Sequence, residues 1–182
     1  MKKERIIVKK LSETHLQERC KWLNHPRIYH DMNMQFPITF DETKKWHERA
    51  LYNSSRFDFA FEVENNIVSM TGLTNIDTGN GLCEFYIMVN PELQSRGYGK
   101  KTTEFTINYA FNKYNIHKVY LYTNNFNERA NKLYEKLGFQ LEGVMRKHKF
   151  KNGELIDRCI YGLLKEEWKN QNYYNSEIKL EF

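Results

Sequence analysis

The chain has 182 residues and a formal net charge of +5 at pH 7, and 40% of its residues are hydrophobic. This length and composition fit one folded domain with its own core and exclude a disordered or low-complexity chain. No run approaches the ~20 apolar residues of a membrane span, and residues 1–9 read as a charged strand rather than a signal peptide, so we expect no membrane partner.

The cysteines and the charge pattern indicate the cellular compartment and the kind of binding partner. Cys20, Cys83 and Cys159 are far apart and odd in number, and they form no Cys-x-x-Cys pair. They indicate reduced thiols in a core, a cytoplasmic location and no metal site. The positive charge is spread among acids with no block of about five like charges, so nucleic-acid binding is not expected. A basic surface would equally suit a small molecule that carries phosphates.

The first third of the chain predicts one strand and two helices. Thr39 and Glu42 are spaced as a capping box, which begins the second of these helices. The elements expected here, in chain order, are a strand over 5–10, a helix from Ser12 that ends before 24–26, an irregular segment over 27–38 and a helix from Thr39 through Ala50.

The rest of the chain predicts a sheet interrupted by two helices. Residues 82–89 are nearly all apolar, as expected for a central strand covered on both faces. Gly138 stops the second helix, and Asn152-Gly153 turns a closing hairpin. The elements expected here are strands over 57–64, 67–75, 82–89, 118–123, 139–150 and 155–164, and helices over 100–114 and 127–137.

This order of elements predicts an α/β domain in which helices cover the faces of one mixed sheet. With three prolines and no Gly/Ser-rich linker, nothing divides the chain. We therefore expect a single domain over 1–182, with a core over about 5–165 and a polar, tyrosine-rich extension over 166–182. The sequence leaves the structure of this extension open.

The segment over 89–100 is the most informative part of the sequence. A buried strand ends there, and Gly97 and Gly99 precede a helix. The glycines permit positive φ and close backbone approach, so successive N–H groups would point toward one anion at the helix N-terminus. Arg96 and Lys100 add positive charge. The segment is neither a P-loop nor the dinucleotide fingerprint, because the required lysine-threonine pattern and third glycine are missing.

Two motifs together resemble a known family. Gln94-x-x-Gly97-x-Gly99 is similar to the acetyl-CoA signature of the GNAT superfamily of N-acetyltransferases. The segment over 127–139 resembles its second signature, Asn-x-x-Ala-x-x-x-Tyr-x-x-x-Gly-Phe. Segments 22–26 and 37–39 resemble the branch with ribosomal-protein N-terminal and polyamine acetyltransferases. The tail over 167–180 resembles the pseudaminic-acid pathway enzyme that acetylates a UDP-linked amino sugar.

The resemblance implies a largely antiparallel twisted sheet in which strands 82–89 and 118–123 splay apart to admit acetyl-CoA. The pantetheine arm would pair with the backbone of residues 88–90, and the pyrophosphate would lie on the amides of 95–100. A β-bulge in the first strand would leave the Val89 amide free to stabilise an oxyanion. The implied coenzyme-binding residues are Met88, Val89, Asn90, Gln94, Ser95, Arg96, Gly97, Tyr98, Gly99, Lys100 and Asn127.

The same resemblance assigns the chemistry. Tyr134 becomes the general acid that protonates the departing thiolate, although an aromatic packing residue would also fit its apolar stripe. Glu84 stands in an apolar strand, so it must be paired, solvated or unusually basic. A basic carboxylate suits proton removal from an ammonium, with a salt bridge or a substrate contact as the alternatives. Asn127 would cap its helix, bond the pantetheine or do both.

The family reacts by direct transfer in a ternary complex, so we expect Cys83 to be a core residue without an acyl intermediate. The acceptor expected first is a UDP-linked 4-amino sugar, because a basic surface and aromatic residues suit a sugar nucleotide. A polyamine, which would demand an acidic pocket, and the N-terminal amine of a ribosomal protein are the alternatives. A non-catalytic acetyl-CoA-binding module is the alternative from another class. The sequence does not decide whether the protein forms a homodimer.

Overall fold

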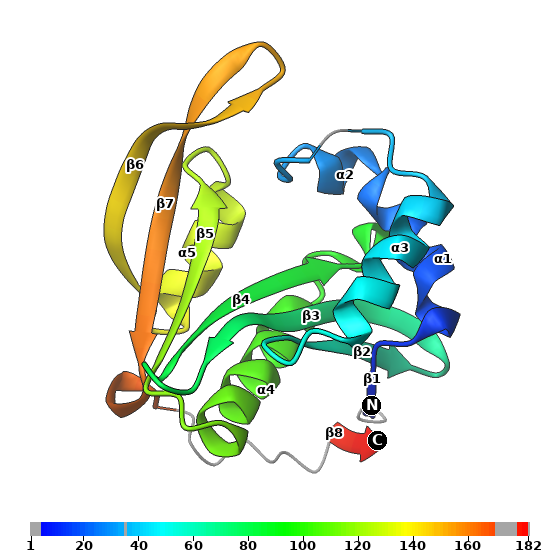
Figure 1. Cartoon of the computed structure of the whole chain (residues 1–182), viewed down its shortest axis with the longest axis horizontal. Helices are drawn as coiled ribbons and strands as arrows, with labels where there is room; N and C mark the ends of the chain where they lie inside the picture. The colour runs from blue at the N-terminus through cyan, green and yellow to red at the C-terminus, as the bar shows by residue number, and fades with distance from the viewer. Residues whose placement is uncertain (1–4, 35, 170–177, 182) are drawn as a thin grey trace.

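The computed structural model describes residues 5–34, 36–169 and 178–181, and it places the strands of this part of the chain in one mixed sheet (Figure 1). The strand order is β6-β7-β5-β4-β3-β2-β1-β8. The strands are β1 Ile6–Lys10, β2 Phe57–Val63, β3 Asn66–Asp77, β4 Leu82–Val89, β5 Lys118–Asn124, β6 Gln140–Lys151, β7 Glu154–Leu164 and β8 Ile178–Glu181. The α-helices are α1 Leu16–Leu23, α2 Pro26–Tyr29, α3 Phe40–Leu51, α4 Tyr98–Lys113 and α5 Glu128–Lys136. Short 3-10 helices cover Glu13–His15, Pro91–Leu93 and Lys165–Glu167.

The sheet consists of two parts that meet at one short parallel contact. β4 and β5 pair only at Leu82 with Lys118, Cys83 with Val119, and Glu84 with Tyr120. Beyond these positions the strands diverge, and β5 leans away from β4 together with the β6–β7 hairpin (Figure 1). The splaying expected between strands 82–89 and 118–123 is therefore confirmed.

Helices cover the two faces of the sheet through separate apolar clusters. On one face, Ile107 of α4 and Tyr134 of α5 join a cluster with Phe85 of β4. On the other face, Trp22 of α1 packs in a cluster with Met88 of β4. β3 and β4 thus both pack against helices on the two faces of the sheet.

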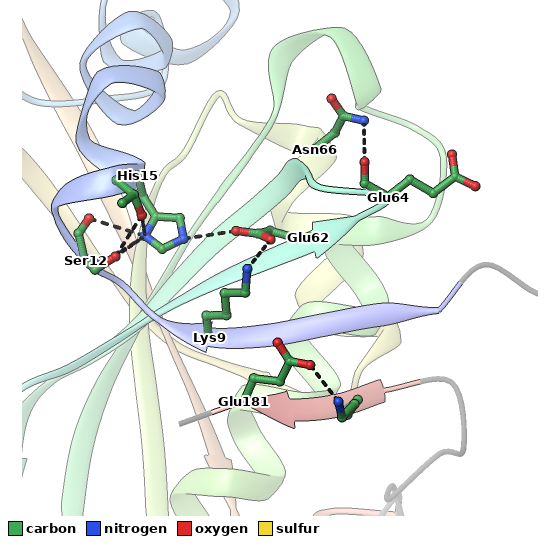
Figure 2. A network of polar contacts seen from close by, with 9 residues as sticks. Lys9, Ser12, His15, Glu62, Glu64, Asn66 and Glu181 are labelled. Carbon is green, nitrogen blue, oxygen red and sulfur yellow. Dashed lines mark hydrogen bonds and ion pairs between the residues drawn. The ribbon is translucent and has the colours of Figure 1, made fainter.

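A buried polar contact fixes the start of α1 to the sheet (Figure 2). Glu62 of β2 accepts hydrogen bonds from Lys9 Nζ at 2.7 Å and from His15 Nε2 at 3.2 Å. The backbone N–H of Ser12 donates to His15 Nδ1 at 3.0 Å, which assigns the ring proton to Nε2. Because both partners of Glu62 precede α1, this contact holds the segment that leads into α1 against β2.

Most expected elements are confirmed, and their local signals are visible. Thr39 and Glu42 form the capping box at the start of α3. Gly138 has a φ of 97°, as a residue just past a helix end requires. The β2–β3 and β6–β7 hairpins turn where expected.

Two expectations about the elements are wrong. Residues 27–29, expected to be irregular, belong to α2, because Pro26 occupies the first helical turn and His25 caps it. β4 is not fully covered on either face, since residues 84 and 86 on one face and 87 and 89 on the other stay partly exposed at the cavity described below. The extension, whose structure the sequence leaves open, contributes β8, which pairs in parallel with β1 from Ile6 and Ile178 onward. The tail residues 172–174 lie outside the described residues.

In the described residues no helix has the length and apolar character needed to cross a membrane.

Candidate active site

A cavity of about 600 Å³ opens where β4 and β5 diverge. Its walls come from β4, β5, α5, the loop before α4, residues 27–34 and the β6–β7 hairpin. Ten residues expected at the site line it: Glu84, Met88, Val89, Gln94, Ser95, Gly97, Gly99, Lys100, Asn127 and Tyr134. Three expected residues do not line it, namely Asn90, Arg96 and Tyr98. The Tyr98 side chain packs in the core beneath α4 instead.

The loop before α4 presents free backbone N–H groups to the cavity. Ser95 and Gly97 have left-handed φ angles of 64° and 87°. The first backbone bond of α4 runs from Lys101 N to Gly97 O at 3.2 Å. Among the described residues, no carbonyl accepts from the amides of Ser95, Arg96, Gly97, Gly99 or Lys100. These amides sit at the positive end of a 16-residue helix and form a site for an anion.

Gly99 lines the cavity between β4 and α5. A Cβ added at Gly99 would lie 3.4 Å from Val89 Cγ2 and 3.7 Å from Leu133 Cδ2, which are ordinary contact distances. Packing among the described residues therefore does not by itself require a glycine at this position.

The ladder between β3 and β4 determines which amides of β4 face the gap. Asn90 N donates to Val68 O at 3.0 Å, and the register runs without a shift from Glu84 to Val89. In an antiparallel pair, bonded and non-bonded residues alternate. The Met88 and Asn90 amides therefore point to β3, whereas the Val89 amide points into the gap.

Two expectations about this strand are corrected. The pantetheine arm was expected against residues 88–90, but of these only Val89 presents its amide to the gap. The expected β-bulge is not in β4, because the register shift lies in β3 between Thr74 and Asp77. Strand alternation alone, without a bulge, frees the Val89 amide.

Tyr134 presents an isolated phenol to the cavity. The residue is 5% exposed, and its ring packs against Phe85, Phe139 and Tyr161. Among the described residues, none forms a hydrogen bond with the Tyr134 hydroxyl. Burial raises the pKa of Tyr134 above its ordinary value. The phenol therefore keeps its proton at neutral pH and has a donor available for a ligand.

Glu84 lies at the edge of the cavity rather than in the core. It is half-buried, and one of its carboxylate oxygens accepts a hydrogen bond from Asn75 Nδ2 at 2.8 Å. Of the alternatives for Glu84, pairing and solvation are therefore both present, because the carboxylate has a hydrogen-bond partner and stays partly exposed at the cavity.

Asn127 caps α5, as expected. Its Oδ1 accepts from Ala130 N at 3.1 Å, which leaves the side-chain amide nitrogen without a partner among the described residues. The residue also lines the cavity. Capping and a contact to a ligand are thus compatible, because they use different atoms.

Two arginines that the sequence analysis did not single out add positive charge beside the loop. Arg129 Nη1 donates to Gln94 Oε1, and Arg27 Nη1 donates to Pro91 O at 2.8 Å. Both line the cavity and the hollow next to it. Arg129 lies inside the second signature at a variable position, so only the folded chain connects it with the loop over 94–100.

The segment over 30–34 forms a cover that is tied to the opposite wall. Asn33 Nδ2 donates to Asn124 Oδ1 at 2.8 Å, and Asn124 Nδ2 donates to Asp31 O at 2.9 Å. Lys151 of the β6–β7 hairpin donates to Met32 O at 2.6 Å. These bonds join residues about ninety or more positions apart in the sequence, and no sequence pattern pointed to them.

Cys83 lies in the core, as expected. It is fully buried beside the point where β4 and β5 pair, and burial raises the pKa of its thiol to about 12. A thiol that holds its proton is a poor nucleophile. All three cysteines are free.

Comparison with known proteins identifies the family. Residues 5–140 match the family model of the acetyltransferase (GNAT) domain, so the chain belongs to the GNAT acetyltransferases. It is an N-acetyltransferase with acetyl-CoA as its acetyl donor. The open amides before α4 and the gap between β4 and β5 fit the diphosphate and the extended arm of this donor.

Relatives and solved structures agree with this assignment. The SPbeta prophage-derived uncharacterized N-acetyltransferase YokL of Bacillus subtilis (strain 168) is 29% identical over 75% of this chain and 77% of that protein. The spermidine N(1)-acetyltransferase of Escherichia coli (strain K12) is 29% identical over 67% of each chain. A crystal structure of spermidine N-acetyltransferase from Vibrio cholerae in complex with CoA and spermine superimposes with a TM-score of 0.84 at 24% identity. It covers 90% of this chain and 97% of that chain, which shows that the fold is shared.

These comparisons do not support the acceptor expected first. None of the three proteins is named for a sugar nucleotide, and two are named for spermidine. The expectation of a UDP-linked amino sugar rested on the tail over 167–180, most of which lies outside the described residues. We therefore do not retain it.

Proposed function

We propose that the chain transfers the acetyl group of acetyl-CoA directly to a primary amine bound beneath the cover over 30–34. The observation that carries this proposal is one continuous cavity, which joins the open amides before α4 to the Tyr134 phenol and the Glu84 carboxylate. A donor site and two proton-transfer groups on one cavity are what acyl transfer to an amine requires.

The bound coenzyme supplies an activated acetyl thioester, and the chain's own residues position it. The amides over 95–100 would hold the diphosphate, with Lys100 and Arg129 adding charge. The Val89 amide, which points into the gap, would donate to the thioester oxygen. This hydrogen bond would be stronger inside the protein than in water, because the local dielectric constant is lower there.

Tyr134 and Glu84 would move the two protons. The Tyr134 phenol would donate its proton to the leaving sulfur, because burial keeps it protonated until then. Glu84 would take the proton from the incoming ammonium, either directly or through a water molecule. Direct transfer is supported by the protonated state of Cys83, which offers no thiolate for an acyl-enzyme.

A polyamine is one acceptor to test. Two of the compared proteins are named for spermidine. In this chain, Asp31 and Glu84 are carboxylates that line the cavity. Asp41 and Glu42 begin α3 and do not line it. The three free thiols also support a cytoplasmic location.

Release of free CoA thiol in the presence of candidate amines tests the proposed function. The panel consists of spermidine, free amino acids, simple alkylamines and short peptides with free N-termini, each with acetyl-CoA. We expect thiol release that depends on an amine and a product whose mass has increased by one acetyl group. Binding of acetyl-CoA without thiol release on the whole panel would instead support a non-catalytic binding module.

A further inference from the structure

Arg158 of β7 is a cation on the cavity wall that has no anionic partner among the described residues. Its guanidinium carbon lies 4.8 Å from the centre of the Tyr122 ring, and it lines the cavity. Its Nε is buried without a hydrogen bond, and among the described residues no carboxylate forms an ion pair with it. Burial lowers the pKa of Arg158, and the charge of Glu84 offsets this effect only in part.

The other buried arginines of the chain are used differently. Arg56 forms a two-bond pair with Asp58, with distances of 2.6 and 2.9 Å. Arg19 also has unpaired nitrogens, but it stacks on Trp46 at 3.8 Å and does not line the cavity. Among the partly or fully buried arginines of the described residues, Arg158 is therefore the one that lines the cavity without a hydrogen bond or an ion pair. A planar guanidinium matches a carboxylate or a phosphate with two parallel hydrogen bonds.

Arg158 and Glu84 lie on the same side of the sheet. Arg158 pairs in register with Asn124 of β5, so their side chains share one face. That face carries Asn124 and Tyr122, which line the cavity below the cover. Glu84 lines the same cavity from β4 and acts electrostatically on Arg158 without forming a direct ion pair. Glu84 and Arg158 thus place opposite charges on one face of the sheet, without a direct ion pair between them.

We propose that the acceptor carries an oxyanion, a carboxylate or a phosphate, on the same small molecule as its amine. The fork of Arg158 binds the oxyanion, and Glu84 faces the amine. The inference rests on the proposed function, and it narrows the acceptor to an amine with an anionic group. A polycation is disfavoured, because it brings a second positive charge to Arg158 and leaves the fork unpaired.

Matched pairs of amines test this inference. 4-Aminobutanoate is compared with 1-aminobutane, O-phosphoethanolamine with ethanolamine, and both pairs with spermidine. We expect the anionic member of at least one pair to give a kcat/KM about 10- to 100-fold higher than its neutral partner, the range of a charge-assisted two-bond pair. The two pairs distinguish a carboxylate from a phosphate.

Variants then assign the preference to Arg158. Arg158→Met removes the charge, Arg158→Lys keeps the charge without the fork, and Arg146→Met is the control on the neighbouring strand β6, where Arg146 is exposed and does not line the cavity. Arg158→Met should abolish the preference by raising KM for the anionic amine much more than for its neutral partner. Arg158→Lys should restore part of it, and Arg146→Met should behave as wild type.

A binding measurement separates failure of this inference from failure of the proposed function. With CoA present, the anionic amine should raise the melting temperature of wild type more than that of Arg158→Met. Turnover with equal kcat/KM for both members of each pair, or with spermidine preferred, would overturn the inference and leave acetyl transfer standing. A loss of the preference in Arg146→Met as well would also overturn the assignment to Arg158. Absence of turnover with every amine would overturn the proposed function and this inference together.

Discussion

Gly97 and Gly153 have almost the same backbone, with φ angles of 87° and 88°, and neither has an atom within 4 Å of an added Cβ. Gly97 begins α4 beside the cavity, whereas Gly153 turns the β6–β7 hairpin. An aspartate at either position therefore meets the same backbone strain and no steric clash. The two glycines differ because only the surroundings of Gly97 are expected to bind the coenzyme.

We expect Gly97→Asp to abolish the rise in melting temperature that acetyl-CoA produces, because its carboxylate repels the diphosphate at the open amides. Gly153→Asp should lose similar intrinsic stability and keep the full rise. Thermal unfolding of both variants with and without acetyl-CoA makes the comparison. An undiminished rise in Gly97→Asp would remove the loop from the coenzyme site.

We expect Tyr134→Phe to lower turnover by about 10²- to 10⁴-fold, the usual contribution of a general acid. Affinity for acetyl-CoA should be retained, because the ring still packs on Phe85 and Phe139. Steady-state kinetics and calorimetric titration measure the two quantities. Unchanged turnover would return Tyr134 to a packing role.

The pH dependence of the same variant gives a second test. A free tyrosine ionises near pH ~10, but burial raises the pKa of Tyr134, so the folded protein keeps the phenol protonated beyond that pH. The ratio of wild-type to Tyr134→Phe turnover should therefore stay constant from about pH 7 to 10. A ratio that falls toward one within this range would show that Tyr134 loses its proton at a lower pH than its burial predicts.

At the level of elements, the floor of the cavity depends on a close approach of β3 to β4. A Cβ added at Gly72 of β3 would lie 2.1 Å from Tyr86 Cε1 and 2.5 Å from Asp58 Oδ1. Tyr86 cannot move aside freely, because its hydroxyl donates to Asp58, which also pairs with Arg56. The missing side chain at Gly72 is thus a packing requirement of this network.

We expect Gly72→Ala to lower the free energy of unfolding by about 1–3 kcal/mol, the usual effect of overpacking. Gly143→Ala on β6 is the control, because its added Cβ would lie 3.8 Å from Ile160 Cγ2 at ordinary contact distance. Urea unfolding monitored by circular dichroism compares both variants with wild type. Equal midpoints for Gly72→Ala and wild type would show that Tyr86 and Asp58 rearrange without cost.

For the whole molecule, the two parts of the sheet are joined by the short pairing of β4 with β5 at three register positions. A ligand that occupies the gap contacts both parts and adds interactions that the free protein lacks. Binding to the folded state alone stabilises it by about 2.7 kcal/mol at a ligand concentration of 100 times Kd.

We expect acetyl-CoA to slow amide hydrogen exchange most in residues 86–89 of β4 and 121–124 of β5, where the strands have no pairing with each other. Residues of β1 and β2, whose ladder is continuous, should change less. Mass spectrometry of exchanged peptides measures this directly. Protection that is uniform over the sheet would show general stabilisation and no bridging at the gap.

The elements that the sequence predicted correctly depend on neighbours in the chain. The capping box of Thr39 and Glu42, the φ of 97° at Gly138 and the Asn152-Gly153 turn involve residues within a few positions of one another. The features that the sequence did not predict differ in origin: α2 follows from local signals at His25 and Pro26, whereas β8 exists because β1 offers it an edge. The partial exposure of β4 beside the cavity exists because β5 diverges from it.

The sequence by itself indicated the family, a loop suited to an anion, and Tyr134 and Glu84 as candidate site residues, because two short motifs encode local backbone geometry. Only the tertiary structure decided that Glu84 is paired with Asn75, that the Val89 amide is free without a bulge, and that Arg158 lines the cavity. These features depend on strand register and burial across residues far apart in the chain. Register and burial are fixed when the whole sheet assembles, so no local pattern carries them.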